Sequence, residues 1–472
     1  MSAAGTPELS KTSPKTSRPK TSRAGLFGWV MFDWATQPVY TLVVTFIFAP
    51  YFVNGFMHEP ILGAALWGYA TGIAQLIAAL LAPILGARSD ALGHRRKPWI
   101  AGFSVLLMLG LCGLWFAYPM QTQYAPLVLV SFGLALIGTE LATVFTNAMM
   151  PGLIGTRRLG TLSGTGWAIG YVGGIFSLAL VAGLLVSDAD TGKTLLGLEP
   201  LFPLDVASRE GDRLVGPFSA VWYLVFALPL FLFTPDLPAD ASITPAGKGL
   251  GGLVRGLKRL YAEHRQVFLF LAARMLYADG LGAIFAFGGI YAGTIFGWGP
   301  TELGLFGIIL AITAAIGAGL GGLMDDALGS KPVIVLMLIV LIIGAIGVLS
   351  VDQDEILFFV PVAERIPDSP ALSSTGERVY LLFAAMIGFA SGPVQAASRT
   401  LLAHLTPPEK TTEFFGFFAF SGKASAFAAP LMIGAVTALA GSQRIGISTA
   451  LVFLIGGLVL LQFVRMERSA KP

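Results

Sequence analysis

Long apolar segments alternate with short polar connections along most of this 472-residue chain. A helix of about 20 apolar residues crosses the ~30 Å hydrocarbon layer of a membrane, so each of these segments is long enough to span. The predicted spans cover residues 25–53, 62–86, 98–118, 124–150, 161–186, 217–234, 265–296, 301–324, 332–350, 379–403, 413–440 and 443–464. This pattern predicts an all-α membrane protein with about twelve transmembrane helices.

The composition indicates a membrane protein and excludes a soluble domain. Hydrophobic residues make up 55% of the chain and charged residues 12%, whereas a soluble chain carries about 25% charged residues. Cys112 is the only cysteine and the four histidines are dispersed, so we expect no disulfide, no metal site and no cofactor. The net charge of +3 is too small to indicate nucleic-acid binding.

A polar loop occurs twice, half a chain apart. The sequence Asp-Ala-Leu-Gly stands at 90–93 and again at 326–329, each time with a glycine four residues upstream and a basic residue and proline downstream. Both copies lie between long apolar segments, which indicates an internal repeat.

The first copy, with Arg95 and Arg96, resembles the loop signature between the second and third helices of the major facilitator superfamily. That resemblance implies two parallel six-helix repeats. It also implies a gating role for the loop, in which Asp90 and Arg95 brace the cytoplasmic helix ends and stabilise an outward-facing state. The residues expected to act in gating or structure are Gly86, Asp90, Gly93, Arg95, Arg96, Asp326, Gly329, Arg399 and Glu413.

Lysine and arginine are concentrated in alternate loops, which predicts cytoplasmic termini and a multi-pass protein of the inner (plasma) membrane. The expected organisation is a disordered basic tail (1–23), a six-helix half (24–234), a cytoplasmic linker (235–264), a second half (265–464) and a short tail (465–472). The linker contains an amphipathic helix that lies either on the membrane surface or in solution.

Seven ionisable residues fall within or at the edges of predicted spans: Asp33, Glu140, Arg274, Asp279, Arg399, Glu413 and Lys423. Each charge at the bilayer centre costs ~2.5–3.5 kcal/mol, so these side chains need partners, protonation or a watery cavity. We expect Asp33 and Lys423 to line a cavity, and Arg399 and Glu413 to form locking pairs near the cytoplasmic boundary. Arg274 and Asp279 serve either each other or a substrate.

Lys423 needs a carboxylate, which Asp33, Glu140, Asp279 or the substrate could supply. Pro38 removes a helix hydrogen bond and is expected to bend the first span just beyond Asp33.

Five further stretches resemble one facilitator branch, the bacterial relatives of the autophagy-related vacuolar amino-acid effluxer. They are Asp33-Trp34-Ala35, residues 145–151, residues 163–174, residues 395–399 and residues 413–423. Thr36 and Thr146 depart from the expected pattern. The resemblance implies a secondary transporter that works by alternating access.

The expected substrate is a small polar or amphoteric solute, with proton coupling and amino-acid efflux favoured. Substrate- or proton-binding residues are expected at Asp33, Trp34, Glu140, Asn147, Trp167, Tyr171, Arg274, Asp279, Gln395 and Lys423. A sugar or drug transporter of the same fold is the alternative, and a non-transporting membrane sensor is the candidate from another class. We expect a monomer in lipid and no enzymatic activity, because no catalytic constellation faces one cavity.

Two glycine stripes predict close helix packing: Gly166, Gly170 and Gly174 in the fifth span, and Gly317 and Gly321 in the eighth. Small residues four apart let helix backbones approach each other. We therefore expect these two stripes to meet on the cytoplasmic side.

Overall fold

The computed structural model describes residues 21–93, 95–188, 191–236, 249–366, 369–370 and 372–466. The expected tails, 1–23 and 465–472, and the first part of the linker lie largely outside these residues. Helices dominate the described part of the chain, and the strands β1 (Glu355–Ile356) and β2 (Val360–Pro361) form one short antiparallel pair. The prediction of an all-α membrane protein is confirmed.

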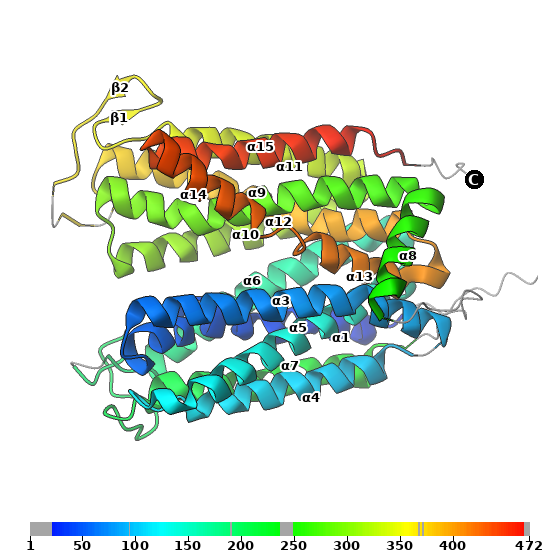
Figure 1. The fold of residues 1–472 in the computed structure, drawn as a ribbon, viewed down its shortest axis with the longest axis horizontal. Coiled ribbons are helices and arrows are strands. Elements are labelled where there is room, and N and C mark those ends of the chain that lie inside the picture. The colour runs from blue at the N-terminus through cyan, green and yellow to red at the C-terminus, as the bar shows by residue number, and fades with distance from the viewer. Residues whose placement is uncertain are drawn as a thin grey trace, which may run out of the picture.

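The first half of the chain forms one bundle (Figure 1). Its helices are α1 (Arg23–Pro38), α2 (Phe48–Tyr51), α3 (Pro60–Ala91), α4 (Lys97–Gly113), α5 (Ala125–Leu153), α6 (Leu159–Leu184) and α7 (Glu210–Phe233). Short π- or 3₁₀-helical pieces are η1 (Val39–Phe46), η2 (Phe52–Phe56), η3 (Leu114–Phe116), η4 (Thr122–Tyr124) and η5 (Thr156–Arg158). Helix α1 ends at Pro38, and the chain continues as the π-helix η1.

The second half forms the other bundle, which lies beside the first in Figure 1. It comprises α9 (Arg265–Phe296), α10 (Pro300–Leu328), α11 (Ser330–Leu349), α12 (Thr375–Leu405), η6 (Pro408–Lys410), α13 (Thr411–Ser421), α14 (Ala428–Ala440) and α15 (Gln443–Gln462). The linker helix α8 (Gly249–Glu263) crosses one end of the molecule, which we call the α8 end. The opposite end, which carries β1 and β2, is the loop end.

Eleven helical segments of the described chain are long and apolar enough to cross a membrane. The predicted span 413–440 is the exception, because the chain leaves the α-helix between α13 and α14. Backbone hydrogen bonds there become three-residue turns, from Lys423 N to Phe420 O, Ala426 N to Lys423 O and Ala428 N to Ser425 O. We call residues 422–427 the helix break.

The two bundles meet mainly toward the α8 end. Helix α6 packs on α10 and α12, and α13 packs on α3 and α5. Beyond the helix break, α14 packs on α15 and α9 of its own half. The first part of the eleventh span therefore packs mainly on the opposite half, and the second part packs on its own half.

The glycine prediction is right about the helices and wrong about the residues. Helices α6 and α10 are in backbone contact, but the contact runs through Gly160, Gly164 and Gly322, where a Cβ on Gly164 would lie 2.5 Å from Ala318 O. The stripe at Gly166, Gly170 and Gly174 faces α1 instead, and Gly317 and Gly321 face α12. Small residues occur on more than one face of these helices, and spacing alone does not show which face meets which neighbour.

Candidate functional site

Two ion pairs join the halves inside the molecule. Arg399 of α12 pairs with Asp33 of α1, with 3.2 Å between Nη1 and Oδ2. Lys423 in the helix break pairs with Glu140 of α5, with 2.7 Å between Nζ and Oε1. In both pairs the acid comes from the first half and the base from the second. The carboxylate that Lys423 requires is therefore Glu140.

Arg399 is the centre of the first pair. Its Nη1 also donates to Asn147 Oδ1 (2.9 Å), and its Nε and Nη2 donate to the hydroxyl and carbonyl oxygens of Ser163. The guanidinium lies over the Trp29 ring at 4.8 Å. Arg399 is 3% exposed, so this set of acceptors compensates for a charge that is almost out of reach of water. Arg399 thus joins α12 to α1, α5 and α6, and its carboxylate partner is Asp33, which was expected to line a cavity.

Lys423 and Glu140 remain partly accessible. Their side chains are 19% and 12% exposed, and Tyr40 of η1 donates a hydrogen bond to the same Glu140 oxygen at 3.1 Å. The helix break places the Lys423 side chain opposite α5, because the backbone there no longer follows the helical direction. This ion pair is partly open to water and joins the two halves. Either member of the pair can therefore exchange the other member for a charged group of a ligand.

A neutral contact lies close to these pairs. Gln395 of α12 donates from Nε2 to the hydroxyl of Tyr171 on α6 at 2.9 Å, again from one half to the other. The Trp167 ring lies 5.9 Å from the Tyr171 ring and 6.0 Å from the Arg399 guanidinium. These contacts group four residues with the ion pairs, namely Asn147, Trp167, Tyr171 and Gln395.

Two expected site residues lie elsewhere. The Trp34 ring stacks on Trp222 at 5.7 Å and contacts Phe176 and Phe226, so it packs within the first half and is not a wall of the inter-half site. Arg274 donates from Nη1 to Phe418 O and Ser421 Oγ at the end of α13. A cation is favourable at a helix C-terminus, and this contact uses the guanidinium that was expected to hold a substrate carboxylate or Asp279.

At the α8 end, the repeated loop holds the start of α13. Asp90 Oδ2 accepts from the backbone N–H of Glu413 at 2.8 Å, and Gly86 leaves no room for a Cβ against the Thr412 carbonyl. The arginine in this contact is Arg96, which is buried, lies 4.0 Å from Asp90 and donates to Thr412. Arg95 is exposed, so the prediction that Arg95 braces the helix ends is wrong.

The second copy of the loop holds the start of α6 in the same way. Asp326 accepts from the backbone N–H of Gly160 (2.8 Å) and of Thr161 (3.0 Å), and from the Thr161 hydroxyl. Gly93 and Gly329 both have positive φ, which glycine adopts without strain. Each loop carboxylate therefore caps the first turn of a helix in the opposite half.

Glu413 forms a third link across this end. Its carboxylate pairs with Arg259 of α8 at 2.8 Å, and Gly256 of α8 packs against the Phe417 ring. Helix α8 leaves Val254, Leu257 and Tyr261 exposed and packs on α3 and α9, so it covers the junction of both halves.

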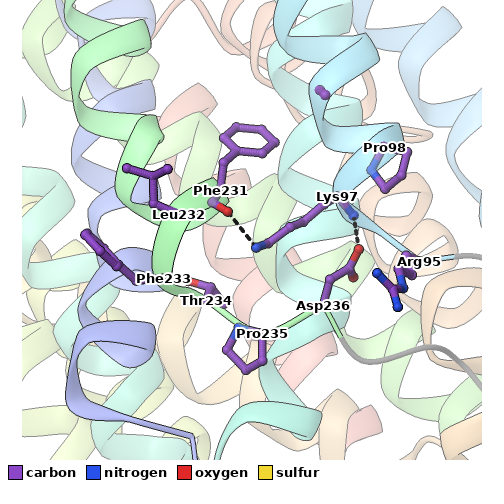
Figure 2. Close-up of a pocket in the computed structure, with 10 residues that line it drawn as sticks. Arg95, Lys97, Pro98, Phe231, Leu232, Phe233, Thr234, Pro235 and Asp236 are labelled. Atoms are coloured by element: carbon purple, nitrogen blue, oxygen red, sulfur yellow. Dashed lines mark hydrogen bonds between the residues drawn. The ribbon is translucent and has the colours of Figure 1, made fainter.

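A surface pocket also opens at the α8 end, between the start of α4 and the end of α7 (Figure 2). Lys97 Nζ donates to Phe231 O, and Asp236 accepts from the Arg96 and Lys97 backbone N–H groups. These bonds join α4 to α7. The pocket lies away from the inter-half ion pairs, and we assign it no part in the site.

Sequence reasoning missed several residues of these networks: Tyr40, Ser163, Gly164, Arg259, Thr412 and Ser425. Ser163 and Gly164 stand in one of the family-like stretches, which was an available signal. The others are ordinary residues whose importance comes from a partner far away in the chain.

Comparisons with known proteins fit this geometry. The model of a family described as "vacuole effluxer Atg22 like" matches residues 155–472. An uncharacterized MFS-type transporter of Bacillus subtilis, YxiO, is 24% identical over 450 residues, which cover 93% of this chain and 95% of that protein. Autophagy-related protein 22 of Cryptococcus neoformans is 28% identical over 321 residues, which are 66% of this chain and 53% of the fungal protein.

Solved structures agree on the fold. The E. coli fucose:proton symporter FucP superposes with a TM-score of 0.68 at 15% identity, over 94% of this chain and 98% of FucP. The human organic anion transporter MFSD10 gives a TM-score of 0.67 at 16% identity, over 93% and 99% of the two chains. At these identities the likeness shows the fold alone. The chain is a multi-pass membrane transporter of the major facilitator superfamily and belongs to its Atg22-like family.

Proposed function

We propose that this transporter moves a small amphoteric solute, with amino-acid-like substrates favoured. The observation that carries the proposal is the pair of inter-half ion pairs, each with its acid on the first half and its base on the second. A zwitterion that offers its carboxylate to the bases and its ammonium to the acids keeps every buried charge paired. A solute of one charge would leave a carboxylate or a cation without a partner.

The partly exposed pair is the proposed point of entry for the substrate carboxylate. When that carboxylate binds Lys423, it displaces Glu140, which keeps only the hydrogen bond from Tyr40. The released Glu140 pairs with the substrate ammonium, or takes a proton when that ammonium binds Asp33, because an unpaired carboxylate in a dry site is unfavourable. In the second arrangement substrate binding is coupled to proton binding. Asp33 stays a second candidate for the proton, although Arg399 engages it in this structure.

The orientation follows from charge. Lysine and arginine gather at the α8 end, which supports a cytoplasmic position for that end and for both termini. Because the two halves meet mainly there, the structure would then correspond to an outward-facing state. The family is described as vacuole effluxers, which supports release of a solute from a membrane-bound compartment, and efflux is the direction that we propose here.

The test is counterflow of radiolabelled solutes in proteoliposomes, with amino acids, small peptides and a hexose compared at pH 5.5 and 8. We expect transport of a zwitterion, and loss of transport in both Lys423→Met and Glu140→Gln. The double variant should recover thermal stability, because no buried charge is left unpaired, and should still not transport. Lys331→Met, which removes contacts only to Gln462 and Val464 at the α8 end, is the matched control.

Normal transport by Lys423→Met across this pH range would show that the lysine serves packing alone, and the mechanism would fail. A sugar is the second candidate, since the buried indole N–H of Trp167 has no hydrogen-bond partner among the described residues and its ring lies beside Tyr171, which binds Gln395. Counterflow of the hexose without that of any zwitterion would favour it.

A further inference from the structure

Asp279 is a buried acid that the proposed substrate site does not use. It lies 14 residues into the 32-residue helix α9, or about 21 Å along the helix axis, which places it near mid-membrane. Its side chain is 4% exposed, and neither carboxylate oxygen has a hydrogen-bond partner among the described residues. Such a group is strongly unfavourable as a bare anion.

A second buried polar group without a hydrogen-bond partner among the described residues lies beside Asp279. Ser425 is part of the helix break, and its hydroxyl is close enough to influence the Asp279 carboxylate. That hydroxyl is also buried and likewise lacks a hydrogen bond of good geometry in the described part of the chain. An acid and a hydroxyl therefore face each other without either being satisfied.

The charged groups on the neighbouring elements are already engaged. Arg274, on the same helix, binds Phe418 O and Ser421 at the end of α13 and stacks on the Phe418 ring. Lys423, two residues before Ser425, pairs with Glu140. The hydroxyl of Tyr277 is bonded to Ser398 of α12. None of these groups neutralises Asp279 by direct contact.

The chemistry of the surroundings indicates which ligand would fit. The Asp279 carboxylate and the Ser425 hydroxyl offer oxygen ligands, at a break where the backbone leaves the α-helix, and oxygen ligands suit a hard monovalent cation. Among the described residues there is no group of three or more His, Cys, Asp or Glu side chains that could hold a transition metal or a divalent ion.

We propose that Asp279 and Ser425 bind a monovalent cation, either Na⁺ or a proton, at the helix break. Occupancy would link α9 to residues 422–427 and so fix the angle between α13, which packs on the opposite half, and α14, which packs on its own half. The binding site stands on this geometry alone. Its role as the site of a coupling ion rests on the proposed transport function.

The test measures thermal unfolding of the purified full-length protein in detergent without substrate. Na⁺ replaces choline at constant ionic strength, at pH 6 and pH 8. For a sodium site we expect Na⁺ to raise the melting temperature by a few degrees, and Asp279→Asn to abolish that rise. Ser425→Ala should increase the Na⁺ concentration for half-maximal stabilisation at least about tenfold, since it removes a ligand and keeps the carboxylate.

Infrared spectroscopy tests whether the site binds a proton instead of Na⁺. If Na⁺ has no effect, a carbonyl band of a protonated carboxyl group at pH 8 that disappears in Asp279→Asn would assign the site to a proton. The idea is overturned if the wild type shows neither response. Should Asp279→Asn fail to fold, an unchanged Na⁺ response and an unchanged carboxyl band in Ser425→Ala would also overturn it.

Asp33→Asn is the control that separates the two proposals. It alters the substrate pair and should impair transport while the cation response stays intact. Since no substrate is present in the cation measurements, failure to find a transported solute leaves their result unaffected.

Discussion

Helix α6 and the α13–α14 segment occupy corresponding positions in the two halves, and they differ in one respect. Each begins under the acidic loop of the opposite half, with Asp326 capping α6 and Asp90 capping α13. Helix α6 then runs unbroken for 26 residues, whereas α13 ends after 11 and the chain resumes a helix only at Ala428.

The packing explains what this difference means. Helix α6 packs on α10 and α12 of the opposite half and also lies along α1 of its own half, where Gly166, Gly170 and Gly174 allow close contact. Helix α13 packs mainly on α3 and α5 of the opposite half, whereas α14 packs on α9 and α15 of its own half. Rearrangement between the halves can therefore bend the eleventh span at the break, while α6 moves as a rigid part of its bundle.

The largest expected effect on transport comes from a bulky side chain in the helix break. A Cβ on Gly422 would lie 2.7 Å from Arg274 Nη1, so Gly422→Leu displaces the guanidinium that holds the end of α13. We expect transport to fall at least about tenfold, since a buried cation loses its acceptors. Gly434→Leu in α14 is the control, because nothing lies within 4 Å of the corresponding Cβ. Equal activity of the two variants would argue against the break as a mechanical element.

A smaller effect on transport is expected where α6 crosses α10. Gly164→Ala places a methyl group against Ala318 O and Gly322 of α10, whereas at Gly170 the nearest atom is 3.5 Å away. We expect Gly164→Ala to prevent full closure of the α8 end and to slow transport severalfold, with Gly170→Ala near wild type. Cross-linking of cysteines introduced at the α8 ends of α6 and α10 reports closure. Equal cross-linking in both variants would contradict the assignment.

The two loop carboxylates should differ in their contribution to stability. Asp326 accepts three hydrogen bonds, and Asp90 accepts one backbone bond and lies 4.0 Å from Arg96. We expect Asp326→Ala to lower the free energy of unfolding by about 1–3 kcal/mol, and Asp90→Ala by less. Asp90→Asn should slow transport with nearly unchanged substrate affinity. A large loss of affinity at normal expression would place Asp90 in the binding site instead.

The smallest effect concerns the start of α13. Burial and the nearby Lys410 ammonium, 3.4 Å from Nε2, lower the pKa of His264 below its usual 6.5. The folded protein then binds this proton less readily than the unfolded chain, so stability should decline as the pH falls from about 6.5 toward the folded-state pKa. In His264→Gln this decline should be reduced, as measured by thermal unfolding at pH 5.5 and 8. An identical pH profile in both proteins would show that His264 does not contribute to the pH dependence of stability.

The fold could be predicted from apolar segment lengths and the repeated loop, because each span must satisfy its own backbone in lipid. The break in the eleventh span was not predicted, although Pro430 gives a signal for it: this proline stands in the first turn of α14 and cannot donate a backbone hydrogen bond to Ala426. At the end of α13 a tertiary contact is added, in which Arg274 binds the carbonyl of Phe418.

The ionisable residues of the site could be located because charge in a membrane is costly, and their pairing could not be derived because it depends on depth and helix rotation. Lys423 had three possible partners in the sequence besides a substrate, and in the structure it pairs with one of them, Glu140. Arg95 and Arg96 are adjacent in the sequence, yet only the second points toward Asp90 and Thr412.

The division of charge between the halves bears on how such a chain could have arisen. Asp33 and Glu140 stand on the first repeat, and Arg399 and Lys423 on the second. A symmetric dimer of the first repeat alone would bring four carboxylates together, and a dimer of the second would bring four cations together, both without compensation. This set of charges is therefore compatible only with two repeats that had already diverged. Gene duplication would have supplied the scaffold, and the opposite charges would have followed.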